Sequence, residues 1–260
     1  MTANKAPLDP AFLTSPLTHR GLHNRDAGVI ENSRAAIMAA IDAGYGIEID
    51  IQQTADDQPL VFHDYNMKRL AAHDVYVRTL PLAEVTAIPL TDGPDGPPPL
   101  GEVLEMVAGR VPLLIEIKDQ HGALGPVDGV LEGKVANTLS GYNGPVALMS
   151  FNPHSVAACA TAAPHIPRGR VSDPFWQEDW AFVPAQRRAE LAKLDDLPVL
   201  GASFTSHYIK DLTSPAIAAV KASGLPVLCW TVRSEAEEKA AREVADNITF
   251  EGYLPTGGQP

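Results

Sequence analysis

Short apolar runs alternate with segments of helical pattern along most of the chain. Two of these runs, Val111–Lys118 (VPLLIEIK) and Val146–Asn152 (VALMSFN), are almost entirely apolar. They are too apolar for strands with one face in water, so we expect strands that are covered on both sides. The other runs of this kind are Leu17–Gly21, Gly46–Thr54, Leu60–Asp64, Arg168–Ser172, Val199–Thr205, Pro226–Val232 and Ile248–Tyr253.

The segments between these runs are rich in Ala, Leu, Glu and Lys and predict helices. They are Ser33–Gly44, Leu100–Gly109, Val127–Ser140, His154–Ala162, Ala185–Leu194, Ser214–Ser223 and Ser234–Val244. N-cap residues are expected at Asn32 or Ser33, at Ser214 and at Ser234, and glycines that end helices at Gly44, Gly109 and Gly224.

Alternating strands and helices predict βαβ units on a parallel sheet. Because the number of units is close to eight, a closed (β/α)8 TIM barrel is favoured over an open doubly wound sheet. Residues 65–99 interrupt the repeat and end in the turn-rich TDGPDGPPP. We interpret this stretch as an insertion after the second β unit. The sequence thus predicts an α/β protein in which residues 1–260 form one domain that includes the insertion.

Charge narrows the range of partners. The chain has 20 Lys and Arg against 32 Asp and Glu, a formal net charge of −12, and its longest basic cluster is the pair Arg187-Arg188. Binding to nucleic acid and stable attachment to a membrane surface are therefore disfavoured. No apolar stretch has the length of a signal peptide core or a membrane span, so we expect a cytoplasmic protein. The sequence does not indicate an oligomeric state.

Three carboxylates fall near the ends of predicted strands, namely Glu48 and Asp50 in GIEIDI and Glu116 in LLIEIK. The carboxyl ends of parallel barrel strands meet on one face, so these side chains should converge there. Buried carboxylates repel one another unless a positive charge lies between them. A divalent cation meets this need, and oxygen ligands suit Mg²⁺ or Ca²⁺ better than zinc. The alternative is that each carboxylate forms a buried salt bridge with an arginine or lysine.

Two histidines and two basic residues also fall near the ends of predicted strands. His19 and His63 end two different predicted strands, and as a pair they could act as base and acid in one displacement. Arg20 and Lys118 would supply fixed positive charge for phosphoryl oxygens, or would only compensate the carboxylates. The other six histidines are interpreted as packed or surface residues; they are His23, His73, His121, His154, His165 and His207.

In this order the motifs resemble those of the glycerophosphodiester phosphodiesterase family. They are HRG at 19–21, EN-S at 31–33, EID at 48–50, FHD at 62–64, EIK at 116–118, SF at 150–151 and CWTV at 229–232. Each motif is weak alone, but the ordered set is specific and covers nearly the whole chain. Members of this family have a TIM barrel with a short insertion after the second strand.

The resemblance also implies roles for individual residues. The metal ligands would be Glu48, Asp50 and Glu116, the acid and base His19 and His63, the phosphate contacts Arg20 and Lys118, and the apolar rim Phe151 and Trp230. Phe151 and Trp230 could equally be barrel core. Glu31 and Asn32 would support this site from behind, and Glu31 could instead favour the N-terminus of the following helix. Glu251 stands where relatives commonly have an aspartate, and we leave it out of the predicted site.

Together these features predict a phosphodiesterase that depends on one divalent cation, Mg²⁺ or Ca²⁺. It would hydrolyse glycerophosphodiesters to sn-glycerol 3-phosphate and an alcohol, by acid and base catalysis from two histidines. One alternative is a lysophospholipase D-like or phosphoinositide-type phosphodiesterase on the same scaffold. Another is a protein that binds a phosphorylated ligand without catalysis. In each case the partner is a small molecule.

Overall fold

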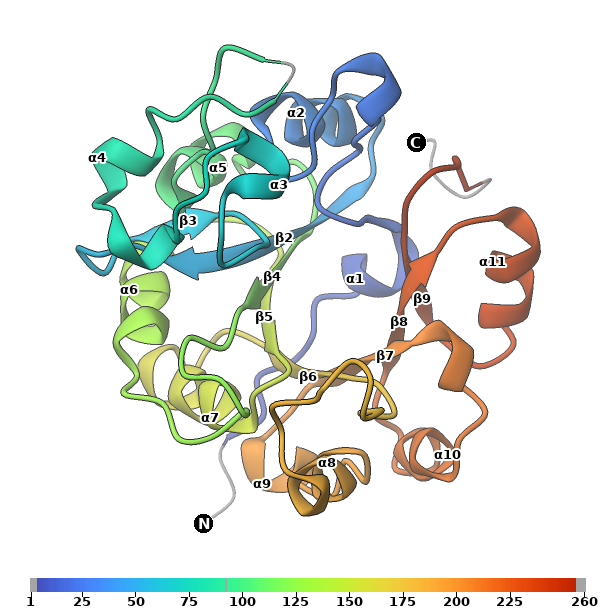
Figure 1. Cartoon of the computed structure of the whole chain (residues 1–260). Helices are drawn as coiled ribbons and strands as arrows, with labels where there is room; N and C mark the ends of the chain where they lie inside the picture. Colours follow the sequence, from blue (N-terminus) through green and yellow to red (C-terminus); the bar gives the residue numbers. More distant parts are fainter. Residues whose placement is uncertain (1–3, 92, 256–260) are drawn as a thin grey trace.

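The computed structural model describes residues 4–91 and 93–255, and nine β-strands in this part form one sheet. Eight of the strands are parallel and close into a barrel (Figure 1). They are β1 (Leu17–Thr18), β2 (Gly46–Gln53), β4 (Leu113–Ile117), β5 (Val146–Ser150), β6 (Arg168–Ser172), β7 (Phe204–Tyr208), β8 (Val227–Val232) and β9 (Asn247–Phe250). Strand β1 closes the barrel because it pairs with both β2 and β9. The predicted TIM barrel is confirmed.

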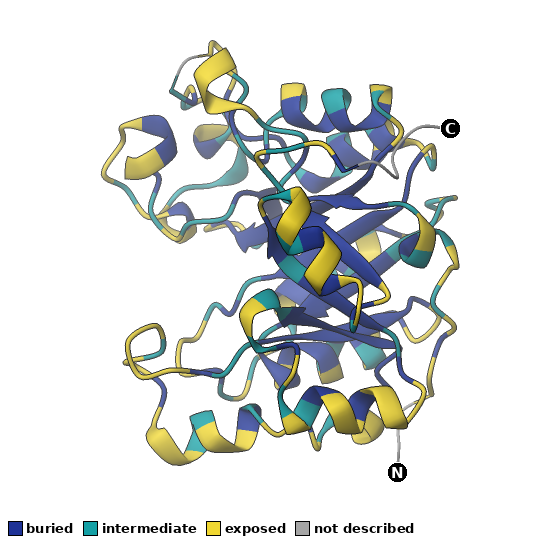
Figure 2. Cartoon of the chain, turned by 90° about the vertical axis from the view of Figure 1, so that its right-hand side faces the viewer, coloured by how far each residue is buried: buried dark blue, intermediate teal, exposed yellow. Residues whose placement is uncertain are grey.

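Helices surround the barrel (Figures 1 and 2). They are α2 (Arg34–Asp42), α5 (Leu100–Val107), α6 (Val130–Thr138), α7 (Pro153–Ala162), α8 (Ala185–Leu191), α9 (Leu197–Leu200), α10 (Pro215–Ala222) and α11 (Glu235–Ala241). The N-caps Ser33, Ser214 and Ser234 each accept a hydrogen bond from a backbone N–H of the first turn, as predicted. In Figure 2 the strands are buried in the middle of the molecule, and the outward faces of the helices are exposed.

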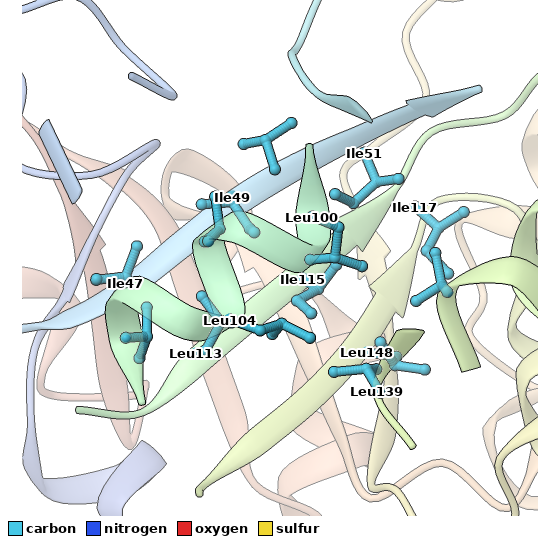
Figure 3. Packing of buried hydrophobic residues seen from close by; sticks show 14 of the residues in the cluster. Ile47, Ile49, Ile51, Leu100, Leu104, Leu113, Ile115, Ile117, Leu139 and Leu148 are labelled. Atoms are coloured by element: carbon cyan, nitrogen blue, oxygen red, sulfur yellow. The ribbon is translucent and has the colours of Figure 1, made fainter. Parts of the chain in front are cut away.

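The alternating sequence of strand β2 places apolar side chains on its outer face and acidic side chains on its inner face. Ile47, Ile49 and Ile51 pack outward against helix α5 (Figure 3). Because side chains of a strand alternate between its two faces, Glu48 and Asp50 point into the barrel. Strand β4 repeats the arrangement with Glu116. The apolar contacts on the outside therefore fix carboxylates on the inside.

Helix α1 (Ala11–Thr14) closes the end of the barrel at which the parallel strands begin. Its Phe12 is fully buried and packs with Leu17, Leu114 and Leu228 from the barrel interior. The side-chain amide of Asn247, at the start of β9, donates to the carbonyl of Phe12 over 2.9 Å. Helix α1 thus lies at the N-terminal end of the strands and leaves the C-terminal end for a site.

The run Leu60–Asp64 is not a parallel barrel strand as the alternating pattern suggested. Strand β3 (Pro59–Val61) pairs antiparallel with β2, with Ile51 opposite Val61. The physical reason is the short connection, because a parallel crossover requires a dozen or more residues. The chain instead turns at Asp57, which has a left-handed φ of 61°. The hairpin extends beyond the barrel and brings His63 back to the C-terminal end of β2.

The insertion continues from this hairpin with α3 (Lys68–Ala71), a short 3₁₀ turn (Val77–Thr79) and α4 (Leu82–Val85). Its apolar residues form a separate cluster over β3; they are Leu60, Phe62, Met67, Leu70, Ala71, Val77, Val85 and Leu90, with Ile30 from the loop before α2. Asp92 of the predicted insertion lies outside the described residues, as do the ends 1–3 and 256–260 of the predicted domain.

The predicted strand Val199–Thr205 is wrong in its first half. Val199 and Leu200 belong to the one-turn helix α9, which has Pro198 in its first turn and is ended by Gly201 at a left-handed φ of 59°. Strand β7 begins only at Phe204. A short apolar run does not distinguish a strand from a helical turn by periodicity, and the flanking Pro198 and Gly201 decide the outcome.

None of the helices in the described ranges has the length and apolar character that crossing a membrane requires.

The barrel packing makes a prediction about stability. Ile115 on β4 is fully buried, so Ile115→Ala should lower the free energy of unfolding by about 2–5 kcal/mol through lost burial and a cavity. Val199 is 62 % exposed, and Val199→Ala should change the unfolding free energy by less than about 0.5 kcal/mol. Denaturant unfolding followed by circular dichroism measures both, and equal effects would contradict the assigned packing.

Candidate active site

A cavity of about 360 Å³ opens at the C-terminal end of the barrel. The residues predicted from sequence that line it are His19, Arg20, Glu48, His63, Glu116, Lys118, Phe151 and Trp230. Asp50 lies directly behind this wall, only 1 % exposed, in contact with Arg20 and Lys118. The structure therefore brings the predicted catalytic, phosphate-binding and metal-ligating side chains together.

Glu48, Asp50 and Glu116 form a buried carboxylate cluster. One oxygen from each lies within 4.8 Å of the others, and the residues are 2 %, 1 % and 7 % exposed. Burial, with the neighbouring charges of Asp50 and Glu116, raises the pKa of Glu48 well above its usual range. An ion with a preference for oxygen ligands would relieve this repulsion, so the cluster fits a hard divalent cation such as Mg²⁺ or Ca²⁺.

Lys118 and Arg20 compensate only part of this charge. The Nζ of Lys118 lies 2.7 Å from Asp50 Oδ1 and 2.7 Å from Glu116 Oε1. The Nε of Arg20 lies 3.3 Å from Asp50 Oδ2, and the backbone N–H of Arg20 donates to Glu48 over 3.0 Å. The salt bridges of the alternative interpretation are thus present, but these five groups, not counting Glu31, which also pairs with Arg20, keep a formal excess of one negative charge. A divalent cation would turn the formal charge of the five groups to about +1, which suits one phosphodiester anion.

The HRG segment turns the chain sharply at the end of β1. Arg20 and Gly21 both have a left-handed φ, 58° and 79°. A Cβ on Gly21 would lie 2.9 Å from the backbone carbon and Cβ of Ala36, so a larger residue at 21 would clash with helix α2. The N–H of Gly21 donates to the carbonyl of Glu48 over 3.2 Å. This turn aims His19 and Arg20 into the cavity beside the carboxylates.

Asn32 and Glu31 hold the site from behind. The amide of Asn32 donates to Asp50 Oδ2 over 2.9 Å, and Glu31 Oε1 accepts from Arg20 Nη1 over 2.6 Å. Although burial would raise the pKa of Glu31, hydrogen bonds and charges of Arg69 and Arg20 lower it to about 2. Glu31 therefore contacts Arg20 and not the carboxylate cluster.

Each of the two histidines is held by a carboxylate. The Nδ1 of His19 lies 2.5 Å from Glu251 Oε2, and the Nδ1 of His63 lies 2.7 Å from Asp64 Oδ1. A carboxylate at Nδ1 selects the Nδ1–H tautomer and leaves Nε2 as the free nitrogen. Within the described part of the chain, neither Nε2 forms a hydrogen bond to another side chain or to the backbone. Burial lowers the pKa of His19 to about 4, although Glu251 acts in the opposite direction.

Sequence reasoning left Glu251 out of the predicted site and did not identify Arg69. Glu251 follows β9 and, besides His19, contacts His23 over 3.5 Å and Arg233 over 2.8 Å. Its position one residue after an apolar strand was the available signal. Arg69 of the insertion donates to both Glu31 and Asp64 and so connects the two histidine-bearing loops. Nothing in the sequence around Arg69 marks it.

Two hydroxyl groups on the cavity wall were also missed. Ser206 Oγ and Thr249 Oγ1 are buried and have no hydrogen-bond partner in the described ranges 4–91 and 93–255. They come from β7 and β9, where alternation points them inward. An unpaired buried hydroxyl costs free energy, so these two groups are available to a polar ligand.

Phe151 and Trp230 belong both to the apolar rim of the cavity and to the core of the barrel. Their ring centroids lie 5.6 Å apart, they line the cavity, and they cover the apolar interior of the barrel above Met149 and Leu228. They are rim and core at once.

A parallel (β/α)8 barrel with carboxylates, cations and imidazoles at the C-terminal ends of its strands has the groups that chemistry on a phosphate ester requires. Comparison with known proteins specifies the class further. Residues 19–246 match the Glycerophosphoryl diester phosphodiesterase family. The chain belongs to this family, and the predicted resemblance is confirmed.

Individual proteins are similar to this chain over much of its length. A glycerophosphodiester phosphodiesterase of Caldanaerobacter subterraneus is 27 % identical over 245 residues, which are 90 % of this chain and 93 % of the relative. An uncharacterized protein of Bacillus subtilis is 32 % identical over 177 residues, 64 % of this chain and 70 % of that protein. An Oleispira antarctica phosphodiesterase, solved in complex with the product sn-glycerol-3-phosphate, aligns with a TM-score of 0.73 at 22 % identity, covering 93 % of this chain and 94 % of that one.

The contact between Glu251 and His19 predicts a tautomer. In the metal-free protein at pH 7, His19 should be neutral and carry its proton on Nδ1, because burial disfavours the imidazolium and Glu251 accepts the Nδ1–H. Glu251→Leu removes this acceptor and should shift population toward the Nε2–H form. Two-dimensional ¹⁵N–¹H NMR of the histidine rings distinguishes the two tautomers. Glu243→Leu, at an exposed position, is the control, and an unchanged tautomer in Glu251→Leu would contradict the role of Glu251.

Proposed function

We propose that this protein hydrolyses glycerophosphodiesters to sn-glycerol 3-phosphate and an alcohol, with one divalent cation and with His19 and His63 as acid and base. The observation that carries this proposal is the convergence of three buried carboxylates, two cations and two carboxylate-held imidazoles on one cavity. Family membership supports it, as does the similarity to a phosphodiesterase that binds sn-glycerol-3-phosphate.

The cation would be held by Glu48, Asp50 and Glu116. When bound, Mg²⁺ or Ca²⁺ supplies Lewis acidity that polarises phosphoryl oxygens. The protein contributes a fixed frame, because Asn32, Arg20 and Lys118 orient Asp50 through hydrogen bonds and ion pairs. Ligands oriented in this way need little rearrangement when the ion binds.

Arg20 and Lys118 bind the phosphate group. Both line the cavity, and both are already fixed by the carboxylates behind them. Positive groups fixed in advance stabilise the charge that develops on the phosphoryl oxygens without a reorganisation cost during the reaction. The guanidinium of Arg20 offers a planar pair of donors, and the ammonium of Lys118 a point charge.

The two imidazoles move protons through Nε2. His19 is buried and neutral at pH 7, so its Nε2 accepts the proton of the nucleophile, which is water or the neighbouring hydroxyl group of the substrate. In the second case water then opens the cyclic phosphodiester and completes the hydrolysis. The imidazolium that forms is stabilised by Glu251 at Nδ1. His63, as the imidazolium whose Nδ1–H is held by Asp64 on the hairpin, donates its Nε2 proton to the oxygen of the departing alcohol. A protein that only binds a phosphorylated ligand has no need of two imidazoles with free Nε2 atoms.

Metal dependence is tested first by binding. The Asp50→Asn variant removes one carboxylate charge and should weaken the affinity for Mg²⁺ or Ca²⁺ by about tenfold or more. Losses of this order follow when a group that supports a metal site is changed. Isothermal titration of the chelator-stripped protein with each ion measures this. The matched control is Asp74→Asn, an exposed aspartate paired with Lys68, which should bind as the unchanged protein does. Turnover of glycerophosphodiesters should disappear with chelator and return with the ion. Unchanged metal affinity in Asp50→Asn would overturn this ligand assignment.

The role of His63 is tested by kinetics. His63→Ala should lower kcat by about 10²–10⁴-fold, because protonation of the leaving alcohol is lost, and should remove one limb of a bell-shaped pH profile. The control is His73→Ala, on the exposed surface of the insertion. Full activity in His63→Ala would refute the assignment.

Binding of glycerophosphodiesters without any turnover in the metal-loaded wild-type protein would show a binding protein instead of an enzyme.

A further inference from the structure

Two groups of side chains with metal-binding atoms converge in the described part of the chain. One is the carboxylate cluster. The other, which we call the histidine cluster, consists of His19, His23 and Glu251. One ligand atom from each of the three residues lies within 4.8 Å of the other two. The proposed reaction uses His19 and Glu251, but it gives His23 no role.

The backbone fixes the positions of the three residues. His19 directly follows β1, Glu251 directly follows β9, and these two strands are paired. The N–H of His19 donates to the carbonyl of Phe250 over 2.8 Å. His23 lies in the turn after β1, where its N–H donates to the carbonyl of Gly21 over 2.9 Å. Side chains carried by such a hydrogen-bonded backbone keep a defined spacing.

The spacing at His23 fits a metal ion better than a hydrogen bond. The Nε2 of His23 lies 3.5 Å from Glu251 Oε2, beyond the usual range of an N–H···O hydrogen bond. This nitrogen is buried and has no hydrogen-bond partner among residues 4–91 and 93–255. Zinc bonds of about 2.0–2.2 Å place neighbouring ligand atoms of a tetrahedral site about 3.3–3.5 Å apart. The gap between His23 and Glu251 therefore has the length of one edge of such a site.

His19 completes the ligand set. Its Nδ1 lies 2.5 Å from the same Oε2 of Glu251, so the imidazole would move away by about 1 Å to reach the zinc spacing. Two imidazoles and one carboxylate, with water in the fourth position, form a donor set that zinc accepts readily. Mg²⁺ and Ca²⁺ prefer oxygen ligands, so the carboxylate cluster and the histidine cluster favour different ions.

The histidine cluster has its own route to solvent. His23 and Glu251 line a second cavity of about 740 Å³, whereas His19 lines the catalytic cavity. An ion and a water ligand can therefore reach the cluster without passing the carboxylates.

Arg233 orients the carboxylate ligand of this cluster. The Nε of Arg233 donates to Glu251 Oε1 over 2.8 Å and leaves Oε2 to the two imidazoles. A carboxylate ligand held by an outer hydrogen bond is a common feature of metal sites. The side chain of Arg233 is 57 % exposed, so water screens its positive charge.

We propose that the histidine cluster is an inhibitory Zn²⁺ site. Zinc binds Nδ1 of His19, Nε2 of His23 and Oε2 of Glu251. It takes the place of the Nδ1 proton of His19, and this proton moves through solvent to Nε2, so the imidazole stays neutral. The Nε2 lone pair is then occupied, and His19 no longer accepts the proton of the nucleophile. The binding of zinc is independent of the proposed function, whereas the inhibition rests on it.

Inhibition is tested with the carboxylate cluster filled by an excess of the ion that supports turnover. The ratio of kcat without zinc to kcat with zinc should be about tenfold or more in the wild-type protein and close to one in His23→Gln, which lacks a zinc ligand. A chelator that binds zinc but not Mg²⁺ or Ca²⁺ should restore turnover. The matched control is His73→Gln, at an exposed position, which should be inhibited as the wild-type protein is. Equal inhibition in His23→Gln and the wild-type protein would place the zinc elsewhere and overturn the proposal.

Binding and tautomer are measured without turnover. Isothermal titration with zinc, again with the carboxylate cluster filled, should give a Kd about tenfold or more higher in His23→Gln and in Glu251→Gln than in the wild-type protein. In ¹⁵N–¹H NMR spectra zinc should convert His19 from the Nδ1–H to the Nε2–H form, and His23→Gln should prevent this change. A His19 tautomer that zinc leaves unchanged in the wild-type protein would overturn the proposal.

These measurements separate the zinc site from the proposed function. If the wild-type protein hydrolyses no glycerophosphodiester but zinc binds and changes the His19 tautomer in a manner that requires His23, the proposed function fails and the zinc site stands. If the protein hydrolyses the diesters and neither zinc binding nor the tautomer depends on His23, the proposed function stands and the zinc site fails.

Discussion

The rest of the site depends on the contacts made by the buried carboxylate of Asp50. It binds Lys118, which follows β4, and both Arg20 and Asn32, which lie in the loop between β1 and α2. Burial alone would raise its pKa, but the charges of Lys118 and Arg20, with a contribution from His63, hold the pKa well below its usual range. A buried charge of this kind is tolerated only when every partner is in place, so the partners must be as well ordered as the strand that carries Asp50. Electrostatic contacts therefore hold the side chains at the C-terminal end of the barrel in place, whereas apolar packing holds the barrel strands.

Much of this architecture follows from local sequence patterns. The alternation of isoleucine with acid in GIEIDI specifies both the outer packing and the inward carboxylates of β2, and the caps Ser33, Ser214 and Ser234 mark true helix starts. The patterns failed where a segment was short. The run at 199–205 was divided by Pro198 and Gly201, and the run at 60–64 had the composition of a parallel strand but too short a connection to be one.

The predicted site was incomplete for a different reason. The barrel could be predicted because each strand pattern is local, and strand ends then converge by geometry. Glu251 and Arg69 act through side chains that reach across from segments far away in sequence. The position of Glu251 after an apolar strand marked it only as a candidate, and nothing local marked Arg69. Of the aromatic side chains that line the cavity, Phe151 and Trp230 were identified because they stand in motifs of the family resemblance, and Trp176, Trp180 and Tyr208 stand in none.

The hairpin that carries His63 lies outside the barrel itself. His63, Asp64 and Arg69 come from β3 and the insertion, which have their own apolar cluster, whereas the carboxylates come from barrel strands. The two parts meet through the ion pairs of Arg69 with Glu31 and Asp64. The barrel strands thus carry the carboxylate cluster, and His63 lies on an attached hairpin with its own apolar cluster. Such a hairpin can vary in length and sequence while the barrel is retained, provided that it still delivers an imidazole to the same point.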